Sequence, residues 1–148
     1  MTTFADSSAL VKLYADEAGH EDVRSLALLV ISQVARVEVP AAVWRKHRMG
    51  ELTTEDSAVL VAAFEADYFG AEEQPPQFAA VAVTSTMLDD AARLTGVHGL
   101  RAYDAIQLAA ALAARSADDR CTGFAAFDIA LREAAGAEGF ALLPTQPI

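Results

Sequence analysis

The sequence has little cysteine, no long apolar run and no excess of basic charge. Its one cysteine, Cys121, rules out an intrachain disulfide, and no cysteine and histidine residues have the spacing of a zinc site. No apolar stretch reaches the length of a membrane span without a charged residue, and the N-terminus lacks a basic segment followed by a signal-like apolar one. We therefore expect a cytoplasmic protein with no membrane association.

The charge balance is acidic, with 11 Lys and Arg residues against 21 Asp and Glu residues and a net charge of −10. This balance argues against a protein that coats nucleic acid with a basic surface. It leaves open an enzyme that handles nucleic acid through bound cations, and also an acidic surface that only aids solubility. The 148 residues, 53% of them hydrophobic, suffice for a buried core, and we expect residues 1–148 to form one domain.

Short apolar segments alternate with helical segments along the chain. We predict strands at residues 3–5, 29–31, 78–83, 120–127 and 140–143. We predict helices at residues 8–14, 21–28, 33–48, 54–69, 84–94, 101–115 and 128–135. This alternation indicates an α/β protein with three layers, in which helices cover both faces of a central parallel sheet. Because ligands of such sheets bind beyond the carboxyl ends of the strands, the strand-to-helix junctions are where we expect chemistry.

Two acidic residues, Asp6 and Asp128, lie at such junctions. Each follows a predicted strand and precedes a predicted helix. One interpretation is a helix cap, which stabilises a helix by about 1 kcal/mol. The other is a ligand-binding carboxylate at the carboxyl edge of the sheet. Both interpretations remain open from these two residues alone.

A third acid, Asp104, lies in the first turn of a predicted helix, where the helix dipole favours negative charge. The run from 105 to 109 that follows it carries no charge. The helix face that we predict to pack comprises Tyr103, Ile106, Ala110 and Ala111. A carboxylate among such residues indicates a functional group more than a freely solvated one.

Glu38 is the fourth acid, and it lies at the edge of a predicted apolar stripe on its helix. The stripe, spaced as i, i+3, i+7 and i+10, comprises Val34, Val37, Ala41 and Trp44. A buried carboxylate without a partner costs several kcal/mol, so Glu38 needs one. Arg45 on the same side of the helix is one possible partner, and a cation in a shared cleft is the other.

Four carboxylates that converge at one edge of a sheet repel one another unless a cation lies among them. Mg²⁺ and Mn²⁺ take oxygen ligands, and Mg²⁺ typically uses a few carboxylates while it keeps waters and substrate phosphates. The bound cation lowers the pKa of a water molecule and neutralises charge on a phosphodiester. Convergence of the four acids would therefore indicate a metal-assisted phosphoryl site.

Four segments in a fixed order carry a family resemblance. They are residues 4–12, 31–38, 99–109 and 127–136. The third is the most specific, because it contains the pattern Leu-x-x-x-Asp-Ala-x-x-Leu-Ala. Together the segments resemble the PIN domain, in particular the VapC-type ribonuclease toxins of prokaryotic toxin–antitoxin pairs, over nearly the whole chain.

The resemblance implies a PIN-like fold with an acidic pocket at the carboxyl edge of its sheet. It implies that Asp6 and Asp104 are the firmest ligands of Mg²⁺ or Mn²⁺, that Glu38 and Asp128 complete the cluster, and that Ser8 orients Asp6. A metal-activated water would then hydrolyse an RNA phosphodiester bond. One departure concerns Ala126, which stands where many relatives carry a hydroxyl residue that would support the last acid.

The resemblance also implies partners: an RNA substrate, a cognate antitoxin protein and a second copy of the chain in a homodimer. The predicted helix 54–69 is apolar on more than one side, which indicates either burial between two layers or a partner surface. Candidates for phosphate contacts are Lys12, Arg36, Arg45, Lys46, Arg48 and Arg101. The alternative function is a catalytically silent PIN-like module that only binds an antitoxin or another protein.

Overall fold

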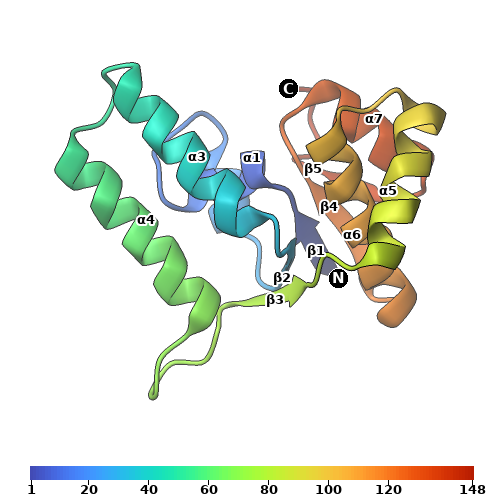
Figure 1. Cartoon of the computed structure of the whole chain (residues 1–148), viewed down its shortest axis with the longest axis horizontal. Coiled ribbons are helices and arrows are strands. Elements are labelled where there is room, and N and C mark those ends of the chain that lie inside the picture. Colours follow the sequence, from blue (N-terminus) through green and yellow to red (C-terminus); the bar gives the residue numbers. More distant parts are fainter.

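A five-stranded, all-parallel sheet forms the centre of the computed structural model, which describes residues 1–148 (Figure 1). The strands are β1 (Thr2–Ala5), β2 (Leu29–Ser32), β3 (Phe78–Val81), β4 (Cys121–Ala125) and β5 (Ala141–Leu143). Their order in the sheet is β3-β2-β1-β4-β5. The chain thus begins in the middle strand, builds one half of the sheet, and then crosses back to build the other. The carboxyl ends of β1 and β4 lie side by side where the order reverses, the usual position of a ligand site.

Helices cover both faces of the sheet, which confirms the predicted three-layer α/β/α architecture (Figure 1). The helical elements are α1 (Ser7–Leu10), the 3-10 turn η1 (Val11–Leu13), α2 (His20–Arg24), α3 (Ala35–Arg48), α4 (Thr54–Phe69), α5 (Ser85–His98), α6 (Ala102–Ala117) and α7 (Ile129–Ala137). Alternate strand residues point to opposite faces. Two cores result, one on each face of the sheet. Phe4 and Phe124 belong to the first core, with α5, α6 and α7, and Ala5 and Ala125 belong to the second core, with α1 to α4.

The predicted elements all exist, but several boundaries differ. The predicted helix 21–28 is only His20–Arg24, and the predicted strand 120–127 is Cys121–Ala125, because the chain leaves the sheet before Phe127. In contrast, α5 continues past Leu94 to His98. The next residue, Gly99, adopts a left-handed conformation with φ 65° and ends the helix. None of the helices has the length and apolar character that a membrane crossing requires.

The predicted packing face of α3 is wrong. The structure buries Ala35, Val39 and Val43, whereas Val37 of the predicted stripe is 68% exposed. The helix carries apolar residues on two sides, and the side that packs on α1 and the sheet is the one with i, i+4, i+8 spacing. Tyr103, which we predicted on the packed face of α6, is exposed as well. The buried face of that helix consists mainly of alanines and Leu108.

Helix α4 lies outermost, beside α3, and also contacts the edge strand β3 of the sheet (Figure 1). Phe64 is buried against the second core, but Val59 and Phe69 are exposed. Burial of α4 between two layers, one of the two interpretations of its apolar residues, is therefore wrong. The exposed residues leave part of its apolar surface uncovered.

Candidate functional site

Asp6 follows β1 directly and caps α1. Its backbone N–H donates to the carbonyl oxygen of Ala125 in β4 at 3.1 Å, which holds the residue at the end of the sheet. Its Oδ1 accepts hydrogen bonds from the Ala9 N–H at 3.0 Å and from the Ser8 hydroxyl at 2.7 Å. The side chain is only 4% exposed. The capping interpretation is thus correct for Asp6, but a solvated surface cap would not be buried to this extent.

Ser8 connects Asp6 to the segment that carries Asp128. While it donates to Asp6, its Oγ accepts a hydrogen bond from the Phe127 N–H at 3.0 Å. The carbonyl oxygen of Ala126 accepts from the Arg132 guanidinium at 3.0 Å. Although Ala126 offers no hydroxyl group, the segment before Asp128 is therefore held on both sides through its backbone.

Glu38 in the first turn of α3 is half-buried, and its partner within the chain is an amide and not Arg45, one of the two partners that the sequence left open. The Nε2 of Gln107 donates to Glu38 Oε1 at 2.8 Å and to Ser7 Oγ at 3.0 Å. No ion pair joins Glu38 to any basic residue in the structure. The carboxylate thus faces the interior between α3 and α6 without a compensating positive charge.

Asp104 and Asp128 share a basic partner. Nη2 of Arg101 lies 3.2 Å from Asp104 Oδ2 and 3.4 Å from Asp128 Oδ2, while the Arg101 side chain is 81% exposed. Asp128 also caps α7 through a hydrogen bond from the Leu131 N–H to its Oδ1 at 2.9 Å. The Arg101 guanidinium is therefore close enough to pair with both carboxylates.

The electrostatics link the four acids. The pKa of Asp6 is raised to about 7, mainly by burial and also by the charges of Glu38 and Asp104, against the lowering effect of the hydrogen bonds from Ser8 and Ala9. Burial likewise raises the pKa of Glu38, with a contribution from Asp104. The pKa of Asp104 is raised by burial and by the charge of Asp128. Asp6, Glu38 and Asp104 thus form the inner part of the cluster, and Asp128 lies at its outer side beside Asp104.

A hard divalent cation fits the chemistry of this donor set. No group of three acidic, histidine or cysteine side chains lies close enough together to enclose a metal ion. Mg²⁺, however, is bound through one or two carboxylates and retains several waters, so it needs no closed cage. The Oε1 of Gln107 is buried and accepts no hydrogen bond from the chain. The site therefore offers carboxylates that a hydrated cation can use, and one buried amide oxygen without a donor from the chain.

Gln107 and Ser7 are the contacts that sequence reasoning missed. Gln107 lies three residues after Asp104 on α6, which places the two on neighbouring positions of one helix face. A polar residue inside an otherwise apolar helical run was the available signal. Arg101 was named only as one of six phosphate candidates, and its position before the Asp104 turn did not reveal the contact with Asp128.

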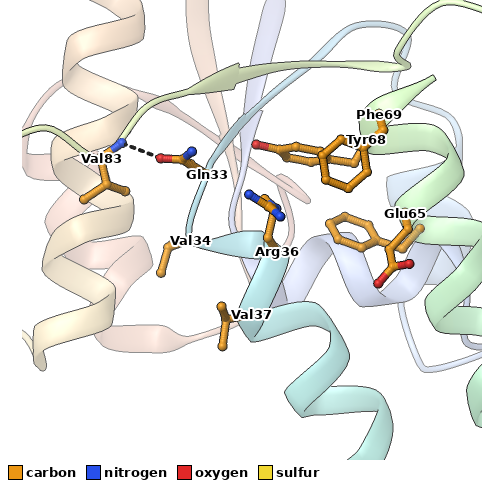
Figure 2. A pocket seen from close by; sticks show the side chains of 9 residues that line it. Gln33, Val34, Arg36, Val37, Glu65, Tyr68, Phe69 and Val83 are labelled. Carbon is orange, nitrogen blue, oxygen red and sulfur yellow. Dashed lines mark hydrogen bonds between the residues drawn. The ribbon is translucent and has the colours of Figure 1, made fainter.

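An apolar groove lies between α3 and α4 (Figure 2). It has a volume of about 500 Å³, and its apolar lining residues are Val34, Val37, Phe64, Tyr68, Phe69 and Val83. The Arg36 guanidinium lies 4.9 Å from the centre of the Phe69 ring, and the Val83 N–H donates to Gln33 Oε1 at 3.2 Å (Figure 2). The groove is therefore suited to apolar side chains and lies outside the acidic cluster.

No protein-family model matches the chain, and no curated protein matches it in sequence. Solved structures do match. A toxin–antitoxin complex from Klebsiella pneumoniae contains a chain that is 16% identical, with a TM-score of 0.60 and 99% of both chains covered. The protein PAE2754 from Pyrobaculum aerophilum is 19% identical, with a TM-score of 0.59 over 90% of this chain and 79% of that one.

A third similar structure is that of VapC20 from Mycobacterium tuberculosis, described as a sarcin–ricin loop cleaving toxin. It is 16% identical, with a TM-score of 0.61 over 93% of this chain and 95% of that one. At this level of identity the likeness concerns the fold. The predicted PIN-domain-like α/β fold is therefore confirmed, and the chain shares it over nearly its whole length with VapC20 and with a chain of a toxin–antitoxin complex.

Proposed function

We propose that the protein is a metal-dependent endoribonuclease that acts as the toxin of a toxin–antitoxin pair. The observation that carries the proposal is that Asp6, Glu38 and Asp104, three carboxylates from different elements, lie near one another, so that the charges of Glu38 and Asp104 raise the pKa of Asp6 and the charge of Asp104 raises that of Glu38. Such a cluster is costly unless a cation balances it. The shared fold with VapC20, described as a sarcin–ricin loop cleaving toxin, supports RNA as the substrate class.

The roles that we propose combine the family resemblance with the positions of the side chains. Asp6 and Asp104 would hold Mg²⁺ or Mn²⁺, Glu38 and Asp128 would complete the acidic set, and Ser8, which donates to Asp6, would fix its orientation. A cation held there would supply a water of lowered pKa and positive charge against the phosphodiester. Asp6 must give up its proton to bind, so cleavage is favoured above pH 7, the value near which its pKa lies.

A specific observation also favours the alternative, a silent module that binds only proteins. Asp6 and Asp128 already cap helices, and Arg101 already neutralises Asp104 and Asp128 in part. In this alternative the acids have structural tasks and bind no cation. The two functions differ in metal binding, which can be measured directly.

RNA cleavage with and without added metal tests the proposal. We expect the wild type to cleave RNA in Mg²⁺ or Mn²⁺ and to stop when a chelator is added, and we expect Asp6→Ala and Asp104→Ala to be inactive. Equal cleavage by all three proteins would contradict the assigned site. Absence of metal binding by calorimetry, with affinity for a protein partner intact, would instead support the silent module.

The proposed partners are a cognate antitoxin and a second copy of the chain, in the cytoplasm. The groove between α3 and α4, with exposed Val37 and Phe69 beside it, supports a protein partner that brings apolar side chains. The shared fold with a chain of a toxin–antitoxin complex supports an antitoxin as that partner. The homodimer is proposed from the family resemblance.

Removing the Arg101 side chain is expected to strengthen cation binding. In Arg101→Gln, Mn²⁺ no longer competes with the guanidinium that contacts Asp104 and Asp128. Exposed ion pairs contribute about 0.2–1 kcal/mol, which corresponds to an increase in Mn²⁺ affinity of about 1.4- to fivefold. Isothermal titration calorimetry measures the change. Arg101→Lys, which keeps the charge, is the control, and an unchanged or lower affinity of Arg101→Gln would contradict the competition.

A further inference from the structure

The side chain of Gln107 is the point at which three elements of the acidic site meet. It projects from α6, is 1% exposed, and donates through Nε2 to Glu38 of α3 at 2.8 Å and to Ser7 of α1 at 3.0 Å. It is the one polar residue among the buried positions of its helix, which otherwise comprise Ala105, Leu108, Ala109, Ala110, Ala111 and Ala114. Its neighbours in the core therefore do not account for an amide at this position.

The amide of Gln107 is oriented so that its donors face Glu38 and Ser7. Both N–H groups of Nε2 are used, one on the Glu38 carboxylate and one on the Ser7 hydroxyl. The reverse orientation would place the amide oxygen against the carboxylate, with two acceptors facing each other. The arrangement leaves the Gln107 Oε1 buried without a donor from the chain. An apolar side chain of the same size would avoid that cost, so the hydrogen bonds that Nε2 donates are what the amide contributes at this position.

We infer that Gln107 is a positioning residue of the acidic site, which fixes the orientation of the Glu38 carboxylate by a hydrogen bond from Nε2 while its second N–H is anchored on Ser7. Arg45 lies on the same side of α3 as Glu38 but does not hold its carboxylate. Gln107 is the α6 side chain that donates a hydrogen bond to Glu38. The inference rests on the proposed function, because the purpose of an aimed Glu38 is to help hold the cation. It adds a role for a residue that touches neither the cation nor the RNA.

The test compares the Mn²⁺ affinity of the wild type with that of Gln107→Met by isothermal titration calorimetry. Methionine has nearly the same volume but donates no hydrogen bond, so Glu38 loses its partner while the core stays filled. We expect an affinity about 10–100-fold lower, the usual loss when a residue that orients a metal ligand is removed. We also expect the KM for RNA to stay near the wild-type value while kcat falls at limiting Mn²⁺.

The matched control is Leu108→Met, which changes an adjacent buried residue of α6 without touching Glu38 and should leave the Mn²⁺ affinity unchanged. Thermal unfolding in the presence of a chelator establishes that each variant is folded. If Gln107→Met does not fold, Gln107→Asn replaces it, because the shorter amide remains polar but is withdrawn from Glu38. The same loss of Mn²⁺ affinity is expected.

A double-mutant cycle with Glu38→Gln separates positioning from a general effect on the fold. If Gln107 acts through Glu38, adding Gln107→Met to Glu38→Gln lowers the Mn²⁺ affinity no further. An equal loss in both backgrounds, or wild-type affinity in Gln107→Met, would overturn the inference and leave the proposed function standing. Absence of Mn²⁺ binding and of metal-dependent cleavage by the wild type would overturn both.

Discussion

Replacing Asp6 with asparagine is expected to abolish metal-dependent RNA cleavage, with a loss of at least about 100-fold in kcat/KM. The estimate is a lower bound, because removal of a residue that merely supports a metal ligand already costs about 10–100-fold. Asparagine keeps the shape of the side chain, and its Oδ1 can still accept from the Ser8 hydroxyl and the Ala9 N–H. The cap of α1 therefore survives while the charge is removed.

The same substitution is expected to stabilise the metal-free protein at high pH. The pKa of Asp6 is raised from 3.8 to about 7 in the folded chain, mainly by burial. Between these two values the unfolded chain has lost the proton that the folded chain retains, so the free energy of unfolding falls as the pH rises. It falls no further above the folded pKa. We expect Asp6→Asn to gain on the order of 2–3 kcal/mol relative to the wild type between pH 5 and pH 8.

Urea unfolding of both proteins at pH 5 and pH 8, in the presence of a chelator, measures this gain. Asp119→Asn is the matched control, because it removes a carboxylate that is exposed and distant from the site, and it should change neither cleavage nor the pH dependence. Wild-type cleavage by Asp6→Asn would contradict the proposed metal ligand. A variant whose stability follows the same pH curve as the wild type would contradict the raised pKa.

The positions of the acids along the fold could be predicted because a parallel sheet has a simple geometry. Asp6 and Asp128 each follow a strand whose apolar run is visible in the sequence, and the carboxyl ends of parallel strands share an edge. The order β3-β2-β1-β4-β5 then places these two ends side by side. Only the family resemblance linked Glu38 and Asp104 to the same edge before the structure did.

The contacts within the site could not be predicted, because they depend on packing between distant segments. Gln107 is 100 residues from Ser7 and 69 residues from Glu38, and no local pattern connects them. The prediction of the buried face of α3 was wrong for a related reason. The helix has apolar residues on two sides, and the elements that pack against it decide which side is buried. Periodicity identifies a helix but not the surface on which it packs.

Replacing Arg132 with methionine is expected to lower the free energy of unfolding by roughly 3 kcal/mol. The residue lies in α7, is 8% exposed and has no acidic partner. Its guanidinium donates only to backbone carbonyl oxygens, those of Ala126 at 3.0 Å, Leu143 at 3.1 Å, Pro144 at 2.8 Å and Gln146 at 3.4 Å. Methionine fills much of the space but removes the guanidinium donor from these carbonyl oxygens, of which that of Leu143 keeps the Ala126 N–H at 3.2 Å. Each buried acceptor that is left without a donor costs about 1–3 kcal/mol.

For a domain of this size the change corresponds to a decrease in Tm of roughly 6–12 °C, measurable by thermal unfolding. Arg120→Met is the matched control, because Arg120 is exposed and pairs only with its neighbour Asp118, so a change within about 0.5 kcal/mol is expected. Similar stabilities of the two variants would contradict the role of Arg132. Since Arg132 holds Ala126, two residues before Asp128, we also expect its loss to loosen the outer side of the acidic cluster, where Asp128 meets Asp104.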